Sequence, residues 1–157
     1  HADGGMRDAL STLDQLRAFE GDANEISVET VRQIFGIQPE KVFLNTIDIL
    51  IEGARDRTFR LIKFLNDQGA DFVRFFSGLN DALLALSMVK ERAEPEGWSK
   101  NGVAGLRKRA EKISAEQLVQ CLVLAQETEE AIRRASRPQI ALTIFLQRAI
   151  SEISTKE

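Results

Sequence analysis

The sequence predicts an all-α protein, and three observations support that prediction. Apolar residues recur three and four positions apart along most of the chain, which is the spacing of an amphipathic helix. Almost no segment alternates apolar with polar residues as a half-buried strand does. Glycine and proline residues divide the chain into pieces of helical length. We therefore expect about seven or eight helices and no sheet.

Five of these helices are expected in the first 91 residues. Each carries an apolar stripe and a start or stop signal. Ser27 and Asp71 are typical N-caps, Pro39 suits the first turn of a helix, and Gly21 and Gly36 follow apolar stripes. The expected ranges are about residues 6–20, 27–35, 39–52, 56–67 and 71–91.

The apolar band of the helix over residues 71–91 is too wide for a helix that rests on a core with one face in water. This helix is therefore either central to the domain or in contact with another subunit on its second face.

The chain changes character between Arg92 and Lys112, where Pro95, Gly97 and Asn101-Gly102 interrupt a polar stretch. Residues 90–112 contain seven basic and four acidic side chains, the most basic local segment. The favoured interpretation is a solvated loop with a short helix over about residues 103–109 and with Trp98 packed back onto the body. A contact with nucleic acid or an acidic partner is the alternative.

Two further helices are expected near the C-terminal end. Ser114 and Gln117 form a capping box, which opens a helix that runs to about residue 135. The last helix begins at Arg137-Pro138 and is apolar on almost every face of its middle. Helices of that kind indicate a bundle whose flanks are covered by neighbours, and the candidate contact residues for oligomerisation are Leu83, Leu122, Ile144 and Phe145.

Composition excludes several classes of protein. With 157 residues, 43% hydrophobic and 29% charged, the chain has the profile of a soluble globular domain without a transmembrane or signal segment, so a cytoplasmic location is expected. A net charge of −3 argues against a dedicated nucleic-acid binder. One cysteine, Cys121, and one histidine, His1, leave no zinc site and no His-based catalytic triad. Cys121 is expected to be a small core residue, and no metal site or catalytic residue is expected in this chain.

One short string suggests a function. Gly4-Gly5-Met6-Arg7 leads straight into a helix N-terminus, where the glycines allow a close backbone approach and the helix end attracts anions. The guanidinium of Arg7 would suit a phosphate. The alternative is that Gly4-Gly5 is a linker and that Arg7 is solvated.

The string Gly4-Gly5-Met6-Arg7-Asp8-Ala9-Leu10-Ser11 resembles the second-sensor motif of AAA+ ATPases, in the version found in the gamma/tau subunit of the bacterial DNA polymerase III clamp loader. The resemblance continues at Ile26–Val31, as in the end of that family's lid domain. It resumes at Ile113–Leu118 and at Pro138–Arg148, which look like the last two helices of its collar domain.

The resemblance implies two regions: the end of a lid domain over residues 1–37 and a helical collar domain over residues 38–157. Arg7, with Gly4 and Gly5, would sense the nucleotide, with ATP and Mg²⁺ held by an upstream ATPase domain that this chain lacks. This chain would then be the back part of a larger subunit and would not itself be catalytic.

The same resemblance implies the partners. These are other gamma/tau copies, the delta and delta-prime subunits and, through the whole complex, the sliding clamp and primed DNA; no membrane is implied. The alternatives are a subunit of another AAA+ clamp-loader-like ATPase, of the replication factor C type, or a free-standing helical adaptor.

Overall fold

The computed structural model describes residues 40–154, which form six α-helices and contain no strand. The predicted all-α fold is therefore confirmed for this part of the chain. The expected helices over residues 6–20 and 27–35 lie outside the described residues, and the boundary between residues 37 and 38 stays a prediction. The described helices are α3 (Glu40–Glu52), α4 (Arg55–Asp67), α5 (Phe72–Lys90), α6 (Lys100–Ala110), α7 (Ala115–Arg134) and α8 (Pro138–Ser154).

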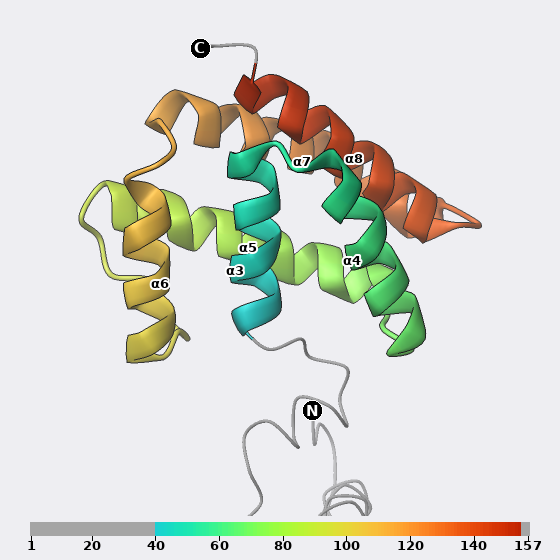
Figure 1. The fold of residues 1–157 in the computed structure, drawn as a ribbon, viewed down its shortest axis with the longest axis horizontal. Coiled ribbons are helices and arrows are strands. Elements are labelled where there is room, and N and C mark those ends of the chain that lie inside the picture. The colour runs from blue at the N-terminus through green and yellow to red at the C-terminus, as the bar shows by residue number, and fades with distance from the viewer. Residues whose placement is uncertain (1–39, 155–157) are drawn as a thin grey trace, which may run out of the picture. The chain divides into compact units, whose positions relative to one another are not determined.

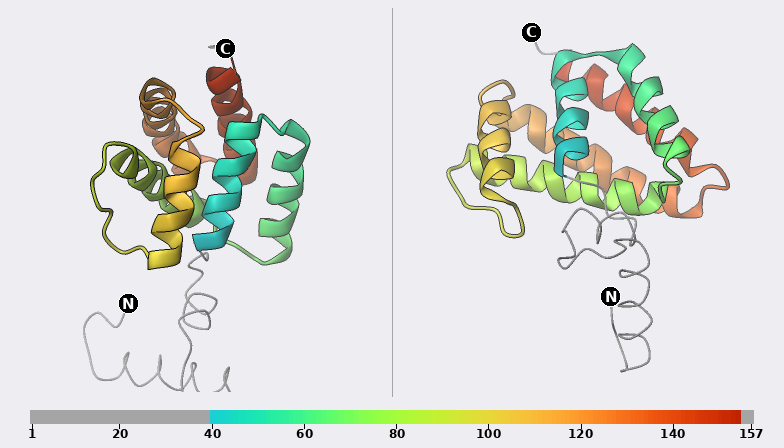
Figure 2. Two further views of the ribbon diagram at one scale, coloured as in Figure 1. Left: turned by 60° about the vertical axis from the view of Figure 1, so that its left-hand side comes forward. Right: turned by 60° about the horizontal axis from the view of Figure 1, so that its bottom comes forward.

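The helices pack in two groups. α3 lies between α6 and α4 and contacts both, and these three helices lie in front in Figure 1. α5 crosses behind α3 and α6, while α7 and α8 pack against each other. After a turn of the view, α7 lies on the opposite side of the described helices from α4 (Figure 2, left). The outer faces of α3 and α4 and the outer face of α7 therefore point in different directions.

α5 is the centre of the core. It contacts α3, α6, α7 and α8, and eight of its side chains are buried. Two aromatic contacts join it to its neighbours: Phe75 stacks on Phe43 of α3, and Phe76 meets Phe145 of α8 edge to face. The wide apolar band of this helix is thus explained by a central position, the first of the two options that its sequence allowed.

α5 is also long and apolar enough to cross a membrane, judged by length and composition alone. Half of the residues in that apolar stretch are buried against other helices of the protein. A core helix has the same profile, so this feature reflects the packing of the bundle.

Local signals in the sequence set the helix ends. Asp71 caps α5, since its carboxylate accepts hydrogen bonds from the backbone N–H groups of Val73 and Arg74 at 3.0 and 3.1 Å. The predicted capping box of α7 is confirmed, with reciprocal bonds of 3.1 and 2.9 Å between Ser114 and Gln117. Gly53 joins α3 to α4 with φ of 66°, a conformation that favours glycine.

The expectation of a mostly irregular segment between Arg92 and Lys112 needs correction, because α6 is three residues longer at its start than predicted. Ser99 caps the helix by accepting a hydrogen bond from Gly102 N–H at 2.9 Å. Ser99 in turn donates from its backbone and its hydroxyl to the carboxylate of Glu40, at 2.8 and 2.6 Å. Asn101-Gly102 therefore lies inside the helix, where Gly102 lets α6 approach Glu40 and Trp98 closely. Trp98 packs against the core, as predicted.

One arginine attaches α6 to α3. The guanidinium of Arg109 donates to the carboxylate of Asp48 at 2.6 Å and to the carbonyl of Leu44 at 3.1 Å. Both charged side chains are largely covered, with 17% and 22% exposure. Gly105 leaves room beside them, since a Cβ atom there would lie 2.8 Å from the Leu44 side chain. The packing of α6 on α3 therefore depends on a charge pair and on a glycine.

A polar seam joins α4 to α8. Arg55 donates to the side chains of Gln147 and Ser151 at 2.6 and 2.7 Å, and Gln147 donates to the buried Thr58 hydroxyl at 2.7 Å. These contacts link residues about ninety positions apart in the chain, so they fix α4 on α8 through side chains that local sequence patterns do not mark.

Replacement of Phe145 by alanine should destabilise the fold strongly, because Phe145 is 1% exposed and packs against Phe76. We expect a loss of about 3–5 kcal/mol in the free energy of unfolding, measured by urea denaturation. The matched control is Ile144→Ala at the neighbouring position, where 53% exposure predicts a loss below about 1 kcal/mol. Equal losses in the two variants would contradict the observed orientation of α8.

Cys121 lies in the core at the middle of α7 with no exposed surface, which confirms its predicted role. Burial, assisted by the negative charge of Glu152, raises the pKa of the thiol to about 12. An unfolded thiol has a pKa of about 8.5, so above that pH the unfolded state gains a thiolate that the folded state cannot form.

The free energy of unfolding should therefore fall as the pH rises above the pKa of the unfolded thiol. Between pH 7.5 and 9.5 we expect a loss of about 1 kcal/mol that is absent from a Cys121→Ala variant. Denaturation of both proteins across this pH range measures the difference. Identical pH dependence in the two proteins would show that the thiol is not protected in the folded state.

Candidate interaction surfaces

The part of the chain that the structure describes presents two pockets and several exposed apolar side chains on its surface. Residues 40–154 contain no group of three or more His, Cys, Asp or Glu side chains that could hold a metal ion. The acidic run near the end of α7 forms ion pairs one turn apart, Glu129 with Arg133 at 2.7 Å and Glu130 with Arg134 at 2.6 Å. The i,i+4 pairing expected on a wet helix face accounts for these carboxylates.

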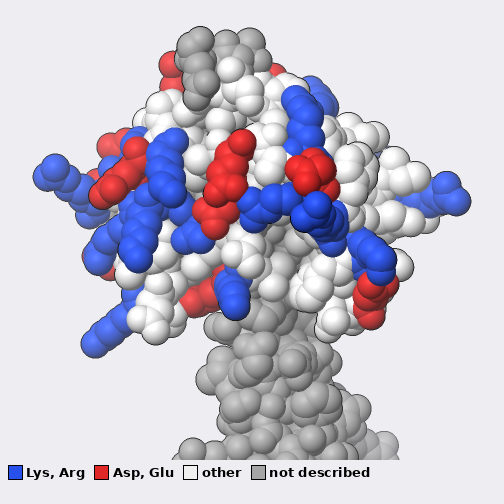
Figure 3. Space-filling model, in the orientation of Figure 1, with Lys and Arg blue, Asp and Glu red and all other residues white. Residues whose placement is uncertain are grey.

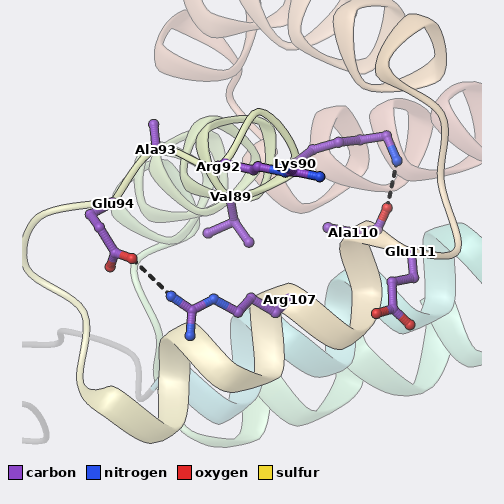
Figure 4. A pocket seen from close by; sticks show the side chains of 8 residues that line it. All are labelled: Val89, Lys90, Arg92, Ala93, Glu94, Arg107, Ala110 and Glu111. Atoms are coloured by element: carbon purple, nitrogen blue, oxygen red, sulfur yellow. Dashed lines mark hydrogen bonds and ion pairs between the residues drawn. The ribbon is translucent and has the colours of Figure 1, made fainter.

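A pocket of about 600 Å³ lies between the end of α5 and α6 (Figure 4). Two of its basic side chains have protein partners: Arg107 pairs with Glu94 at 2.8 Å, and Lys90 donates to the Ala110 carbonyl at 2.8 Å. Arg92 reaches the pocket from a backbone with φ of 63°. The Arg107–Glu94 pair thus links α6 to the start of the loop that precedes it.

This pocket belongs to the most basic segment of the sequence, residues 90–112. Lys90, Arg107 and Arg109 all bind acceptors within the protein. On the face shown in Figure 3, basic side chains are mixed with acidic ones rather than gathered into an uninterrupted patch. A contact of this segment with nucleic acid or an acidic partner stays the untested alternative, and the three paired side chains take part in the packing of α6.

A second pocket, the α3–α4 pocket, combines apolar walls with positive charge. Its volume is about 470 Å³. Apolar side chains from both helices line it, and Phe64 at its edge is 45% exposed. Three cationic side chains and no acidic one contribute to the lining. The lining residues are Lys41, Val42, Asn45, Ile49, Arg57, Arg60, Leu61 and Phe64.

The outer face of α7 has the opposite charge. Glu116, Val119, Val123 and Glu127 follow at intervals of three and four residues and form one stripe, which we call the α7 stripe. The apolar side chains of Val119 and Val123 are 57% and 53% exposed, so this face of α7 presents apolar surface to solvent. α7 contains no basic residue before Arg133, so the stripe is apolar in its middle and acidic at both ends.

The four predicted oligomerisation residues occupy different environments. Leu83 and Phe145 are each 1% exposed and belong to the core, so in this structure they support the fold and present no surface to a partner. Leu122 is half-buried against the core, whereas Ile144 is exposed on α8. The other described large apolar residues that are exposed are Phe59, Phe64, Leu84, Val119, Val123 and Ile140. The predicted nucleotide-sensing residues Arg7, Gly4 and Gly5 lie outside the described residues.

The α3–α4 pocket was not predicted from the sequence. Its α4 half has a recognisable signal, because Arg57, Arg60 and Phe64 follow at i, i+3 and i+7 and share one face. The other lining residues, among them Lys41 and Ile49, belong to α3. They come to lie beside α4 because the chain turns at Gly53. A stripe of mixed arginine and phenylalanine indicates a surface, but the pocket exists only once the two helices pack.

The chain resembles known proteins beyond local motifs. Protein STICHEL-like 1 of Arabidopsis thaliana is 25% identical over 133 residues, which cover 85% of this chain and 12% of that protein. The Bacillus subtilis DNA clamp loader delta protein has a similar fold, with a TM-score of 0.61 at 15% sequence identity. That match covers 93% of this chain and 46% of the delta protein, so the chain spans less than half the length of either relative.

A family model gives the more specific result. The model of domain III of DNA polymerase III subunits gamma and tau matches residues 26–157, which include all six described helices. The resemblance found in the sequence is thereby confirmed for residues 26–157, whereas the second-sensor motif at Gly4–Ser11 stays a prediction. The likeness to the delta protein shows that the bundle resembles the clamp-loader collar fold. The chain belongs to the family of DNA polymerase III gamma and tau subunits, of which it contains domain III.

Proposed function

We propose that this chain is an assembly region that joins subunits of the bacterial replicative clamp loader, the complex that loads the sliding clamp on primed DNA. The observation that carries the proposal is the family match over residues 26–157. The fold shared with the Bacillus subtilis clamp loader delta protein supports it, because related helical domains in different subunits can pack against one another. Gamma/tau copies, delta and delta-prime are the proposed partners.

The surface of the described helices supports the same proposal. Seven large apolar side chains are exposed on α4, α5, α7 and α8, where they are available to a partner. Residues 37–157 contain 18 basic and 17 acidic side chains, a net charge of +1. A nearly neutral surface with apolar positions suits contact with other proteins better than contact with DNA.

ATP binding and hydrolysis are assigned to another domain of the parent subunit, with Arg7 of this chain as a sensor of the nucleotide. In this proposal ATP and Mg²⁺ bind to an ATPase domain that precedes this chain, and Arg7 responds to the γ-phosphate. The arginine would stabilise negative charge on the phosphates and would lose that contact after hydrolysis. Gly4 and Gly5 would allow the backbone to approach the nucleotide.

The chain should form a complex with the delta and delta-prime subunits of the same organism without hydrolysing ATP. Co-expression followed by size-exclusion chromatography with light scattering measures the complex, and a phosphate-release assay measures hydrolysis. A chain that elutes alone at micromolar concentration, or that turns over ATP by itself, would contradict the proposal. A chain that elutes alone would favour a free-standing adaptor.

Arg7→Ala in the full-length subunit should lower ATP-dependent clamp loading and leave assembly of the complex intact. We expect a loss of at least about tenfold in loading rate, because a charge-assisted contact with phosphate is removed. Loading of a fluorescent clamp on primed DNA gives the rate, and native mass measurement gives the assembly. Arg17→Ala is the matched control, since Arg17 lies outside the motif. Normal loading by the Arg7 variant would refute the sensor assignment.

A further inference from the structure

We propose that a lysine face on α3 and α6 contacts the phosphate backbone of DNA. The lysine face consists of Lys41 on α3, Lys100 and Lys108 on α6, and Lys112 just after α6. The proposal goes beyond the assembly role, because it assigns a DNA contact to this chain itself. DNA is the expected nucleic acid, since the family is one of DNA polymerase subunits.

α6 is the most basic of the described helices. It contains four basic residues and no acidic one, whereas each of the other five described helices contains at least one aspartate or glutamate. Over α6, on the left of Figure 3, basic side chains project into solvent. The net charge of +1 for residues 37–157 is therefore the average of an uneven distribution.

The lysines of this face are exposed and lack partners. Within residues 40–154, no hydrogen bond or ion pair involves Lys41, Lys100, Lys108 or Lys112. The two arginines of α6, by contrast, each pair with a carboxylate. Glu111 is exposed between two of the lysines and offsets part of their charge. The remaining positive charge is available to an incoming anion, and no protein contact has to break first.

The packing of α6 on α3 places the lysines along one seam. Hydrogen bonds join the first residue of α3 to the residue before α6, and the last turn of α6 to the third turn of α3. Lys41 and Lys100 lie near the start of this seam, because each directly follows one of the residues bonded there. Lys108 lies near its end. Lys100 and Lys108 are about 12 Å apart along the helix axis, which corresponds to about three or four steps along one strand of a duplex.

The lack of exposed apolar side chains on α3 and α6 favours nucleic acid over a protein as the partner. The exposed large apolar residues of the described chain lie on α4, α5, α7 and α8. A protein interface has an apolar centre, which lysines alone do not supply. Contacts between lysine and phosphate need no such centre, because the release of counterions from the nucleic acid drives them. Subunits and DNA are thus expected to contact different helices.

Charge reversal at two lysines of α6 tests the contact. The variant is Lys100→Glu with Lys108→Glu, and its matched control is Arg137→Glu with Arg148→Glu. Both arginines are exposed, lack partners within residues 40–154, and give the same change in total charge. Circular dichroism and thermal melting check that both proteins fold. Lys100→Gln with Lys108→Gln replaces the lysine variant if that variant melts early.

Fluorescence anisotropy of a labelled primed DNA, a duplex with a single-stranded overhang, measures binding of the 157-residue chain at increasing salt. For the wild-type chain, four phosphate contacts predict a slope of about −3 when log K is plotted against log salt concentration. The lysine variant should bind at least about tenfold more weakly at low salt, with a slope less steep by about 2. The control should bind within about twofold of the wild-type chain.

Three results of the binding experiment would each overturn the proposal: no DNA binding by the wild-type chain, an unchanged slope in the lysine variant, or equal weakening of the control. The lysine variant should also join delta and delta-prime as the wild-type chain does. Loss of that complex would show that the lysine face meets a protein subunit, and it would overturn the DNA contact as well.

The assembly role is tested separately by complex formation of the wild-type chain. A chain that joins delta and delta-prime but does not bind DNA overturns the DNA contact and leaves the assembly role standing. A chain that binds DNA through the lysine face but joins neither subunit has the opposite consequence.

Discussion

The burial of α5 among four other helices is the constraint on which the rest of the structure depends. Its wide apolar band can be removed from water only if helices cover it from several directions, and α3, α6, α7 and α8 do so. The aromatic contacts of Phe75 with Phe43 and of Phe76 with Phe145 fix two of those helices against it. α4 is positioned indirectly, through its contacts with α8 and α3.

The covering helices are held to one another by polar contacts. Arg109 connects α6 to α3 through Asp48, and Arg55 connects α4 to α8 through Gln147. Such contacts add orientation to the nonspecific attraction of the core, because a guanidinium requires its acceptors in a defined plane. They fix α3 on α6 and α4 on α8, and the α3–α4 pocket is lined by residues of α3 and α4.

Buried apolar residues stabilise the fold, whereas exposed apolar residues are available for assembly. Leu83 and Phe145 are buried inside the bundle. Val119, Val123 and Phe64 are exposed to solvent, although these residue types are also apolar. A sequence-based choice of oligomerisation residues therefore mixes the two groups. Helices that are apolar on more than one face indicate that some residues must meet a neighbour, but the pattern does not say whether that neighbour is in the same chain.

The sequence by itself determined the helical class, most helix ends and the family, because these depend on local patterns: apolar spacing, the cap at Asp71, the box at Ser114 and Gln117, and short motifs. It missed the start of α6, since Asn101-Gly102 is typical of a turn unless Glu40, about sixty residues away, holds Ser99 in place. Only the tertiary structure decided which apolar residues are buried and which cations surround a pocket. Both properties depend on contacts between residues far apart in the chain, and local sequence patterns do not specify such contacts.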